Sequence, residues 1–374
     1  MSSERIRRIG LENVVMADTE ITRIDGAAGR LLYRGYDIED LADNASYEEV
    51  AYLLMFGTLP DEDELEAFTA DLASRRTLPA PLVDTIEELA ADAAPMTMLR
   101  LGLLYLSALD GRADEDDRDL HVDRGLDILA KVPTILAYYD QFRNGREPVP
   151  PREDLGHAAN FLYMLNGEEP DAATADCLDT CLILPADHGI NASTFTARVV
   201  TSTQSDIYSA IVGAISAIKG PLHGGASGNV LGMFEQIESP ETAADFIDDM
   251  IDSGERVPGF GHRVYQTIDP RAVILRGISA RLAENADDPA MYEIAHNVEE
   301  HMRETIGIDT NLDYYSAVAY HYLGIPDDLF PLMFCQARVA GWVAQALEQY
   351  EDNRLIRPRA EYVGPENLSY ADQK

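Results

Sequence analysis

Apolar residues recur at helical spacing through most of this chain, and this periodicity limits its fold more than any other feature. The repeats run through 82–89, 98–109, 122–142, 155–165, 172–184, 193–201 and 329–350. Ser46 and Glu49 have the spacing of a capping box, and Gly57 is placed to end the helix that they begin. Asp61 and Glu64 start the next helix in the same way. The pattern predicts a mostly all-α protein.

Two local signals interrupt or modify the helical pattern. β-Branched and aromatic residues flank the turn-forming Asp25-Gly26 pair, in 20–24 and 30–34, and predict a small N-terminal β-hairpin. Pro133 should bend or break the helix predicted over 122–142, because proline removes a backbone donor and clashes with the preceding turn. The segment 207–218 carries almost no charge, so we expect it to be buried on nearly all sides.

Glycine and proline divide the chain into three predicted stretches. Glycines are dense at 220–228 and 257–261, and the Gly324-Ile-Pro326 break precedes the last long helix. We expect a large helical domain formed by 1–218 and 326–374, which includes a C-terminal tail. We expect a small helical domain over 219–325 to carry most of the candidate site residues. The breaks near Gly220 and Pro326 are the expected hinges.

The chain is strongly acidic, with 66 Asp and Glu against 29 Lys and Arg and a formal net charge of −37. Lysine occurs only at positions 131, 219 and 374, so arginine supplies nearly all of the positive charge. Such a surface repels the phosphates of nucleic acids and anionic lipid headgroups, and we expect neither as a partner. Concentrated salt would screen the self-repulsion, because the Debye length falls to about 3 Å near molar salt. We therefore expect a salt-rich cytoplasm.

Targeting and redox signals agree with a cytoplasmic location. The N-terminal sequence MSSERIRRIG has no apolar stretch behind its arginines, so neither a secretory signal nor a membrane anchor is expected. The apolar runs 210–218 and 331–347 are too short, or are interrupted by Arg338, to span a bilayer. Three cysteines are expected to be packed thiols and not a disulfide framework: Cys177, Cys181 and Cys335.

Histidine, carboxylate and arginine placement indicates a site. The chain has no dinucleotide fingerprint or phosphate loop, and no histidine pair has metal-ligand spacing. His188, His223 and His262 lie beside glycines in turn-like segments, where a ligand can approach an imidazole closely. Asp313, at a predicted helix start, is either an N-cap or a functional carboxylate. Arg338 lies inside an apolar helix and needs an anion or water nearby, because burying it unpaired costs several kcal/mol.

These residues belong to longer motifs. Lys-Gly-Pro-Leu-His-Gly-Gly-Ala at 219–226, Gly-Phe-Gly-His-Arg-Val-Tyr with Asp-Pro-Arg-Ala within 259–272, and Asn-Leu-Asp-Tyr-Tyr-Ser at 311–316 resemble citrate synthase motifs in order and approximate spacing. Asp187-His188-Gly-Ile-Asn191 and Arg357-Pro358 extend the resemblance over more than half of the chain. It implies a two-domain helical fold of the shorter, prokaryotic type.

The resemblance also implies three catalytic roles. Asp313 would remove a methyl proton from acetyl-coenzyme A, His223 would hydrogen-bond the developing enol oxygen, and His262 would polarise and protonate the ketone of oxaloacetate. The residue types suit this chemistry. The α-proton of a thioester is very weakly acidic, so a carboxylate removes it only when a positioned donor stabilises the enol oxygen.

Substrate contacts are implied in the same way. His188, Arg271 and Arg338 would hold oxaloacetate, for which planar guanidinium groups supply paired hydrogen bonds. Arg357 would reach a carboxylate from a second subunit, so the resemblance implies an active homodimer. Arg263 would contact a phosphate of coenzyme A. No metal and no bound cofactor is expected, and acetyl-coenzyme A acts as a co-substrate.

Two other functions stay open at this point. A methylcitrate synthase would use the same groups with propionyl-coenzyme A, and one methylene changes binding by only about 1–3 kcal/mol. A non-catalytic protein that binds dicarboxylates or coenzyme A would keep the scaffold without the reaction. Gln266 departs from the family pattern, because many relatives carry a basic residue there. A neutral side chain at this position makes binding of the coenzyme phosphates less certain.

Overall fold

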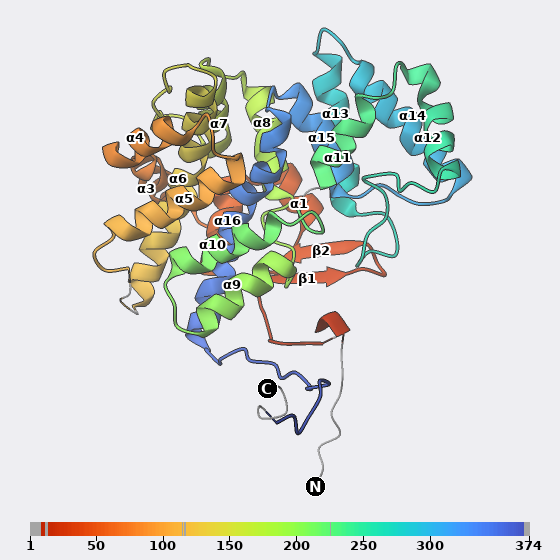
Figure 1. Ribbon diagram of the computed structural model, residues 1–374. Coiled ribbons are helices and arrows are strands. Elements are labelled where there is room, and N and C mark those ends of the chain that lie inside the picture. The colour runs from red at the N-terminus through yellow and green to blue at the C-terminus, as the bar shows by residue number, and fades with distance from the viewer. Residues whose placement is uncertain (1–8, 12–13, 114, 116, 225, 370–374) are drawn as a thin grey trace.

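The computed structural model describes residues 9–11, 14–113, 115, 117–224 and 226–369. The arginines at positions 5, 7 and 8, Gly225 of the glycine-rich histidine motif, and Lys374 lie outside the described residues. Most of the described chain is α-helical (Figure 1), and this confirms the predicted fold class. The helices are α1 (Ile38–Asn44), α2 (Tyr47–Phe56), α3 (Glu62–Arg75), α4 (Ala80–Leu89), α5 (Pro95–Leu109), α6 (Arg118–Arg143), α7 (His157–Asn166), α8 (Ala172–Ile183), α9 (Ala192–Ser202), α10 (Ile207–Ile218), α11 (Ala226–Phe234), α12 (Ala243–Asp252), α13 (Pro270–Glu284), α14 (Ala290–Thr305), α15 (Leu312–Tyr322) and α16 (Phe330–Glu351). Short 3-10 turns are η1 (Ile9–Leu11), η2 (Pro240–Thr242) and η3 (Asp327–Leu329).

Helix ends follow the capping signals of the sequence. Ser46 and Glu49 form a capping box, in which the Glu49 carboxylate accepts the Ser46 amide at 2.7 Å. Gly57 ends α2 in the left-handed region, at a φ of 93°. Both predictions are confirmed. Of the bend or break predicted at Pro133, the break does not occur, because α6 runs without interruption from Arg118 to Arg143, and its central residues are buried on all sides by neighbouring helices.

A small antiparallel sheet confirms the predicted N-terminal hairpin. Strands β1 (Thr22–Asp25) and β2 (Arg30–Tyr33) pair with Thr22 opposite Tyr33, and β3 (Tyr36–Asp37) pairs with β2. The hairpin turn lies against the loop 262–267, where the amide of Gln266 donates to the carbonyl of Gly26 at 2.8 Å. A Cβ at Gly26 would lie 2.1 Å from the Val264 carbonyl oxygen, so only glycine allows this approach. The sheet therefore supports a loop that carries a predicted site residue.

Helix α16 runs through the centre of the structure and contacts α2, α5, α6, α8, α9 and α10. Most of its residues are buried, including Trp342 at 0% exposure. The loop after α8 lies directly on α16, because a Cβ at Gly341 would be only 2.2 Å from the Ala186 carbonyl oxygen. Glycine at this position thus brings the loop that contains His188 against the central helix.

Helices α11 to α15 pack on one another beside the rest of the helices (Figure 1). Among them α13 contacts α1 and α8, and α11 contacts α16. The segments before β1 and after α16 leave the helical body at the same end (Figure 1). Across the residues that the structure describes, no helix combines the length and the apolar content needed to cross a membrane.

Gly341→Ala should destabilise the protein, because the new methyl group would overlap backbone that cannot move without shifting the loop after α8. We expect a loss of roughly 1–3 kcal/mol in the free energy of unfolding, measured by chemical denaturation. Gly277→Ala on α13 is the matched control, since no atom lies within 4 Å of its added Cβ. That change should stabilise by roughly 0.5–1 kcal/mol through helix propensity. Equal stabilities of the two variants would contradict the close packing at Gly341.

Candidate active site

A cavity of about 850 Å³ is lined by α16, the starts of α9, α13 and α15, the segment before β1, and the loops that contain His188, His223 and His262. Most of the site residues predicted from the sequence line it, although they come from distant parts of the chain: His188, His223, His262, Arg263, Arg271, Asp313 and Arg338. Arg357 is not among the described residues that line this cavity; it is exposed in the extended segment that follows α16. The fold therefore brings together every predicted site residue except Arg357.

His223 lies in the turn between α10 and α11 and is held by Ser193 at the start of α9. The Ser193 amide donates to Nε2 of His223 at 3.2 Å, and the Ser193 hydroxyl lies 2.9 Å from the same nitrogen. Trp342 of α16 donates to that hydroxyl at 3.2 Å. Burial, and then the charge of Arg338, lower the pKa of His223 to about 4, so the ring is neutral at pH 7. Since Nε2 accepts an amide hydrogen, the proton of the neutral ring is on Nδ1.

In His262 the other ring nitrogen, Nδ1, is the one that accepts hydrogen bonds from the protein. Its Nδ1 accepts the backbone amides of Val264 and Tyr265, at 3.0 and 3.1 Å. Burial, and then the charge of Arg271, lower the pKa of His262. The neutral ring therefore carries its proton on Nε2, which is the nitrogen that it can offer to a ligand.

His188 packs beside His262, with ring centroids 5.5 Å apart, and its Nε2 lies 3.3 Å from the hydroxyl of Tyr265. The His188 ring is buried, and the pKa of His188 is lowered well below its usual value, first by burial and then by Arg271 and Arg338. A third neutral imidazole thus borders the cavity. It can exchange a hydrogen bond with a ligand without adding charge.

Two buried guanidinium groups give the cavity its positive charge. Arg271 forms a two-pronged ion pair with Asp269, at 3.0 Å from Nε and 2.8 Å from Nη2. Burial acts to lower the pKa of Arg271, but the Asp269 carboxylate outweighs it and the pKa is raised. Arg338 donates from Nε to the carbonyl of Pro185 at 2.9 Å, and burial followed by the charge of Arg271 lowers the pKa of Arg338. Arg271 is already paired with Asp269, whereas the described residues give Arg338 no ion pair, so a bound anion would stabilise the charge of Arg338.

Asp313 lies in the first turn of α15, but it is not the helix cap. Asn311 is the N-cap, and its side-chain oxygen accepts the Asp313 amide at 3.0 Å. The Asp313 carboxylate is therefore not used for capping. Burial raises the pKa of Asp313 to about 6, although Arg271 and Arg338 act to lower it. A carboxylate with a pKa near neutrality is a better base than an exposed one.

Several residues of the site were not singled out from the sequence. Ser193, Trp342 and Tyr265 fix the histidines, and the segment 14–17 with Thr19 forms one wall of the cavity. These contacts join segments far apart in the chain, and no local pattern marks them. Asp269 is the exception. It is the N-cap of α13 and lies two positions before Arg271, and this spacing could have predicted the ion pair from the sequence.

The arrangement combines a carboxylate of raised pKa, neutral imidazoles with fixed N–H groups, and buried guanidinium groups. Such a site can remove a proton next to a carbonyl group and stabilise the oxygen on which charge develops. It can do so while holding a second, anionic substrate. The fold and the site define a helical enzyme of the acid–base class that acts on carbonyl compounds.

Comparison with known proteins identifies the family. The family described as "Citrate synthase, C-terminal domain" matches residues 10–359. The citrate synthase of Haloferax volcanii is 50% identical over 99% of this chain and 98% of that protein. A 2-methylcitrate synthase of Corynebacterium glutamicum is 40% identical over 98% of this chain and 97% of that protein. A solved citrate synthase of Thermoplasma acidophilum, in a ternary complex with carboxymethyl coenzyme A and oxaloacetate, superposes with a TM-score of 0.92 at 34% identity and covers 98% of both chains.

This chain belongs to the citrate synthase family, whose members are acyltransferases that form a carbon–carbon bond. The predicted resemblance is confirmed.

Asp313→Asn should stabilise the free protein near pH 7.5. The pKa of Asp313 is about 6 in the folded protein, against about 3.9 for an unfolded chain. Ionised Asp313 therefore destabilises the fold above pH 6, and this penalty fades as the pH falls toward the unfolded pKa. We expect a gain of roughly 1–3 kcal/mol in the free energy of unfolding near pH 7.5, and less near pH 5.

Urea denaturation at the two pH values measures this gain. The exposed Glu304→Gln on α14 serves as the control and should change stability by no more than about 0.5 kcal/mol. A loss of stability in Asp313→Asn near pH 7.5 would contradict the raised pKa.

Proposed function

We propose that this protein condenses acetyl-coenzyme A with oxaloacetate and hydrolyses the product thioester to citrate and free coenzyme A. One observation carries the proposal: Asp313, His223 and His262 line a single cavity together with two buried arginines. Membership of the citrate synthase family and the 50% identity with the Haloferax volcanii citrate synthase support the same reaction.

In the first step the Asp313 carboxylate removes a methyl proton from acetyl-coenzyme A. The electron pair of the broken C–H bond moves to the thioester carbonyl, and its oxygen gains negative charge. His223 donates Nδ1–H to that oxygen, because its Nε2 is already occupied by the Ser193 amide. A neutral imidazole can stabilise the enol oxygen without the cost of burying another cation beside Arg338.

In the second step the enol carbon attacks the ketone carbon of oxaloacetate. The ketone oxygen takes a proton from Nε2 of His262, whose Nδ1 is held by two backbone amides. The ring then regains a proton from solvent, and Asp313 releases to solvent the proton that it took from acetyl-coenzyme A. The product is a thioester of citrate. Water then attacks the thioester carbonyl and the C–S bond breaks. The oxygen of water enters the new carboxylate, one of its protons goes to the sulfur of coenzyme A, which leaves as the thiol, and the other proton is released.

Oxaloacetate has two carboxylates, and Arg271, Arg338 and His188 are placed to hold it. Both guanidinium groups are buried, so their hydrogen bonds to a carboxylate are only weakly screened by solvent. Arg357 would complete the set from a second subunit of a homodimer, since it is exposed on a segment that leaves the helical body of its own chain. Arg263, exposed at the cavity, would contact a phosphate of coenzyme A.

The residues 219–325 would act as a small domain that closes over the two substrates. Helices α11 to α15 lie in this range and pack on one another, which supports movement as a unit. The thioester of acetyl-coenzyme A must be kept from water until the new bond has formed, and domain closure provides that protection. Gly220 and Pro326 are the proposed hinges, at the two ends of the segment.

The activity is tested by following thiol release from acetyl-coenzyme A in high-salt buffer, with and without oxaloacetate. We expect release that depends on oxaloacetate and is faster with acetyl- than with propionyl-coenzyme A. Preference for the acetyl group would rest on a small difference, because one methylene is worth only about 1–3 kcal/mol of binding. A strong propionyl preference would instead identify a methylcitrate synthase, although the Corynebacterium glutamicum protein is less similar, at 40% identity, than the Haloferax volcanii citrate synthase at 50%.

Asp313→Asn is the control for the same assay and should lose at least about 100-fold in kcat, which is the usual contribution of a general base. In the wild type, kcat/KM should fall as the pH drops below about 6, because protonation removes the Asp313 base. Normal turnover by Asp313→Asn would rule out this carboxylate as the base.

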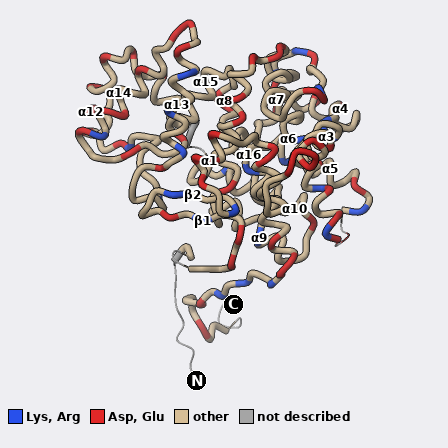
Figure 2. Tube along the Cα trace, turned by 180° about the vertical axis from the view of Figure 1, so that it is seen from behind, with Lys and Arg blue, Asp and Glu red and all other residues tan. Residues whose placement is uncertain are grey.

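The protein would work in a salt-rich cytoplasm. Acidic residues are spread over helices such as α3, α12 and α14 and over the connecting loops, whereas basic residues are few (Figure 2). The net charge of −37 and the similarity to a Haloferax volcanii protein both support this setting.

The melting temperature should therefore rise by several degrees between about 0.1 and about 2 M KCl, because counter-ions screen the repulsion among surface carboxylates. Differential scanning calorimetry measures the change, and equimolar sucrose controls for general exclusion from the surface. A melting temperature that stays constant or falls as KCl is added would contradict the salt adaptation.

A further inference from the structure

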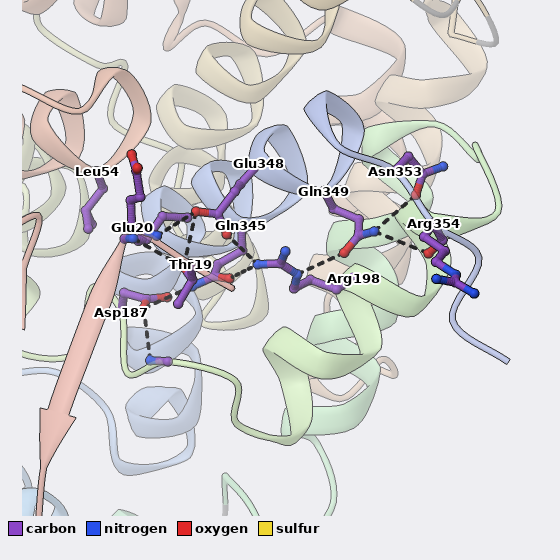
Figure 3. A network of polar contacts seen from close by, with 12 residues as sticks. Thr19, Glu20, Leu54, Asp187, Arg198, Gln345, Glu348, Gln349, Asn353 and Arg354 are labelled. Carbon is purple, nitrogen blue, oxygen red and sulfur yellow. Dashed lines mark hydrogen bonds and ion pairs between the residues drawn. The ribbon is translucent and has the colours of Figure 1, made fainter. Parts of the chain in front are cut away.

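A largely buried polar network extends from the His188 loop to residues 19–20, before β1, and to residues 353–354, after α16 (Figure 3). Its centre is Arg198 of α9, which is 3% exposed and lies against α16. Arg198 donates from Nη1 to Gln345 Oε1 and to Glu348 Oε2, each at 2.7 Å, and from Nε to Gln349 Oε1 at 3.0 Å. One guanidinium group thus contacts three side chains of the central helix.

Gln345 connects this arginine to the loop that carries His188. Its Nε2 donates to Oδ2 of Asp187 at 3.3 Å, and the same carboxylate oxygen accepts the amide of Gly189 at 3.0 Å. Asp187 and Gly189 are the two chain neighbours of His188. The carboxylate therefore closes a turn around His188, and Gln345 holds that carboxylate from the side of α16.

Arg198 decides which way the Gln345 amide faces. A guanidinium group has donors only, so it requires the amide oxygen on its own side. The amide nitrogen is then turned toward Asp187, whose carboxylate needs donors because it is 0% exposed. Arg198 and the Asp187 carboxylate thus require the same orientation of the Gln345 amide, and without Arg198 only the 3.3 Å hydrogen bond to Asp187 would maintain it.

The second arm of the network reaches another wall of the cavity. Oε1 of Glu348 accepts the Thr19 hydroxyl at 3.2 Å and the Glu20 amide at 3.0 Å. Thr19 lines the cavity, together with residues 14–17 just before it. The ion pair of Arg198 with Glu348 thus fixes the N-terminal wall, while the Gln345 arm fixes the His188 loop.

We propose that Arg198 and Gln345 are positioning residues, which set the affinity for the dicarboxylate substrate by holding His188 in its place through Asp187. Neither side chain lines the cavity, so neither touches the substrate. This inference rests on the proposed function, in which His188 holds oxaloacetate. It predicts a larger effect on oxaloacetate than on acetyl-coenzyme A, because the network reaches the loop of Arg263 only through His188, whose Nε2 lies 3.3 Å from the Tyr265 hydroxyl.

Gln345→Met tests the proposal, since methionine keeps the length and burial of the side chain but removes the amide. We expect the KM for oxaloacetate to rise about ten-fold, which is the effect of losing one hydrogen bond to a charged group. kcat and the KM for acetyl-coenzyme A should stay within about two-fold of the wild type. Calorimetric titration of oxaloacetate into the protein should show the same loss of affinity without turnover.

Gln336→Met is the matched control. Gln336 is also a buried glutamine of α16, but neither of its side-chain amide atoms has a hydrogen-bond partner among the described residues. Its replacement should leave both KM values within about two-fold of the wild type and the stability equal or higher. If Gln345→Met does not fold, Arg198→Lys is used, because one ammonium group cannot keep the three contacts of the guanidinium group.

The outcomes separate the two proposals. No thiol release and no oxaloacetate binding by the wild type would overturn the proposed function itself. An active wild type, with Gln345→Met and Gln336→Met sharing the same KM for oxaloacetate, would overturn the positioning role alone. A fall in kcat with unchanged KM in Gln345→Met would also overturn it.

Discussion

Burial of α16 through the middle of the protein is the constraint on which the site depends. A helix enclosed on all sides is expected to be apolar, yet one stripe of α16 carries Arg338, Trp342, Gln345 and Gln349 at spacings of one helical turn. Polar atoms in such a place need partners inside the protein. Their partners are a loop carbonyl, Ser193, Asp187 and Arg198, so the stripe gathers the loops that form the cavity.

Local sequence signals predicted those parts of the structure that short-range chemistry decides. Helix ends at Ser46 and Gly57 follow their capping residues, and the glycine-flanked imidazoles lie where a ligand can approach them. The position of Arg338 inside an apolar helix predicts a nearby anion or water, and in the structure Arg338 borders the cavity. Of the bend or break predicted at Pro133, the break was wrong because the rule considers only the backbone of one helix. In the structure the packing around α6 outweighs the loss of one hydrogen bond.

Other features of the site could not be read from the sequence because they arise from long-range contacts. Nothing near Ser193 in the chain indicates that its amide fixes the tautomer of His223, thirty positions away. The sequence also left open whether Asp313 caps a helix or acts as a base, and only the structure shows that Asn311 is the cap. Once Asn311 is seen to cap α15, the Asp313 carboxylate has no capping role, and burial, which raises its pKa to about 6, makes it a stronger base than an exposed aspartate.

The charge distribution presents a physical problem that salt resolves. The chain carries a net charge of −37, whereas its cavity contains buried guanidinium groups suited to anions. Over long distances the surface repels an anionic substrate, and inside the cavity the arginines attract it. Salt acts unequally on these two forces, because the Debye length of about 8 Å at physiological ionic strength shrinks to about 3 Å near 1 M. Interactions across open solvent are then screened, but contacts between desolvated groups are barely affected. Under the proposed function, concentrated salt would thus relieve the repulsion that opposes both folding and the approach of an anionic substrate, while the buried guanidinium groups would keep their attraction for it.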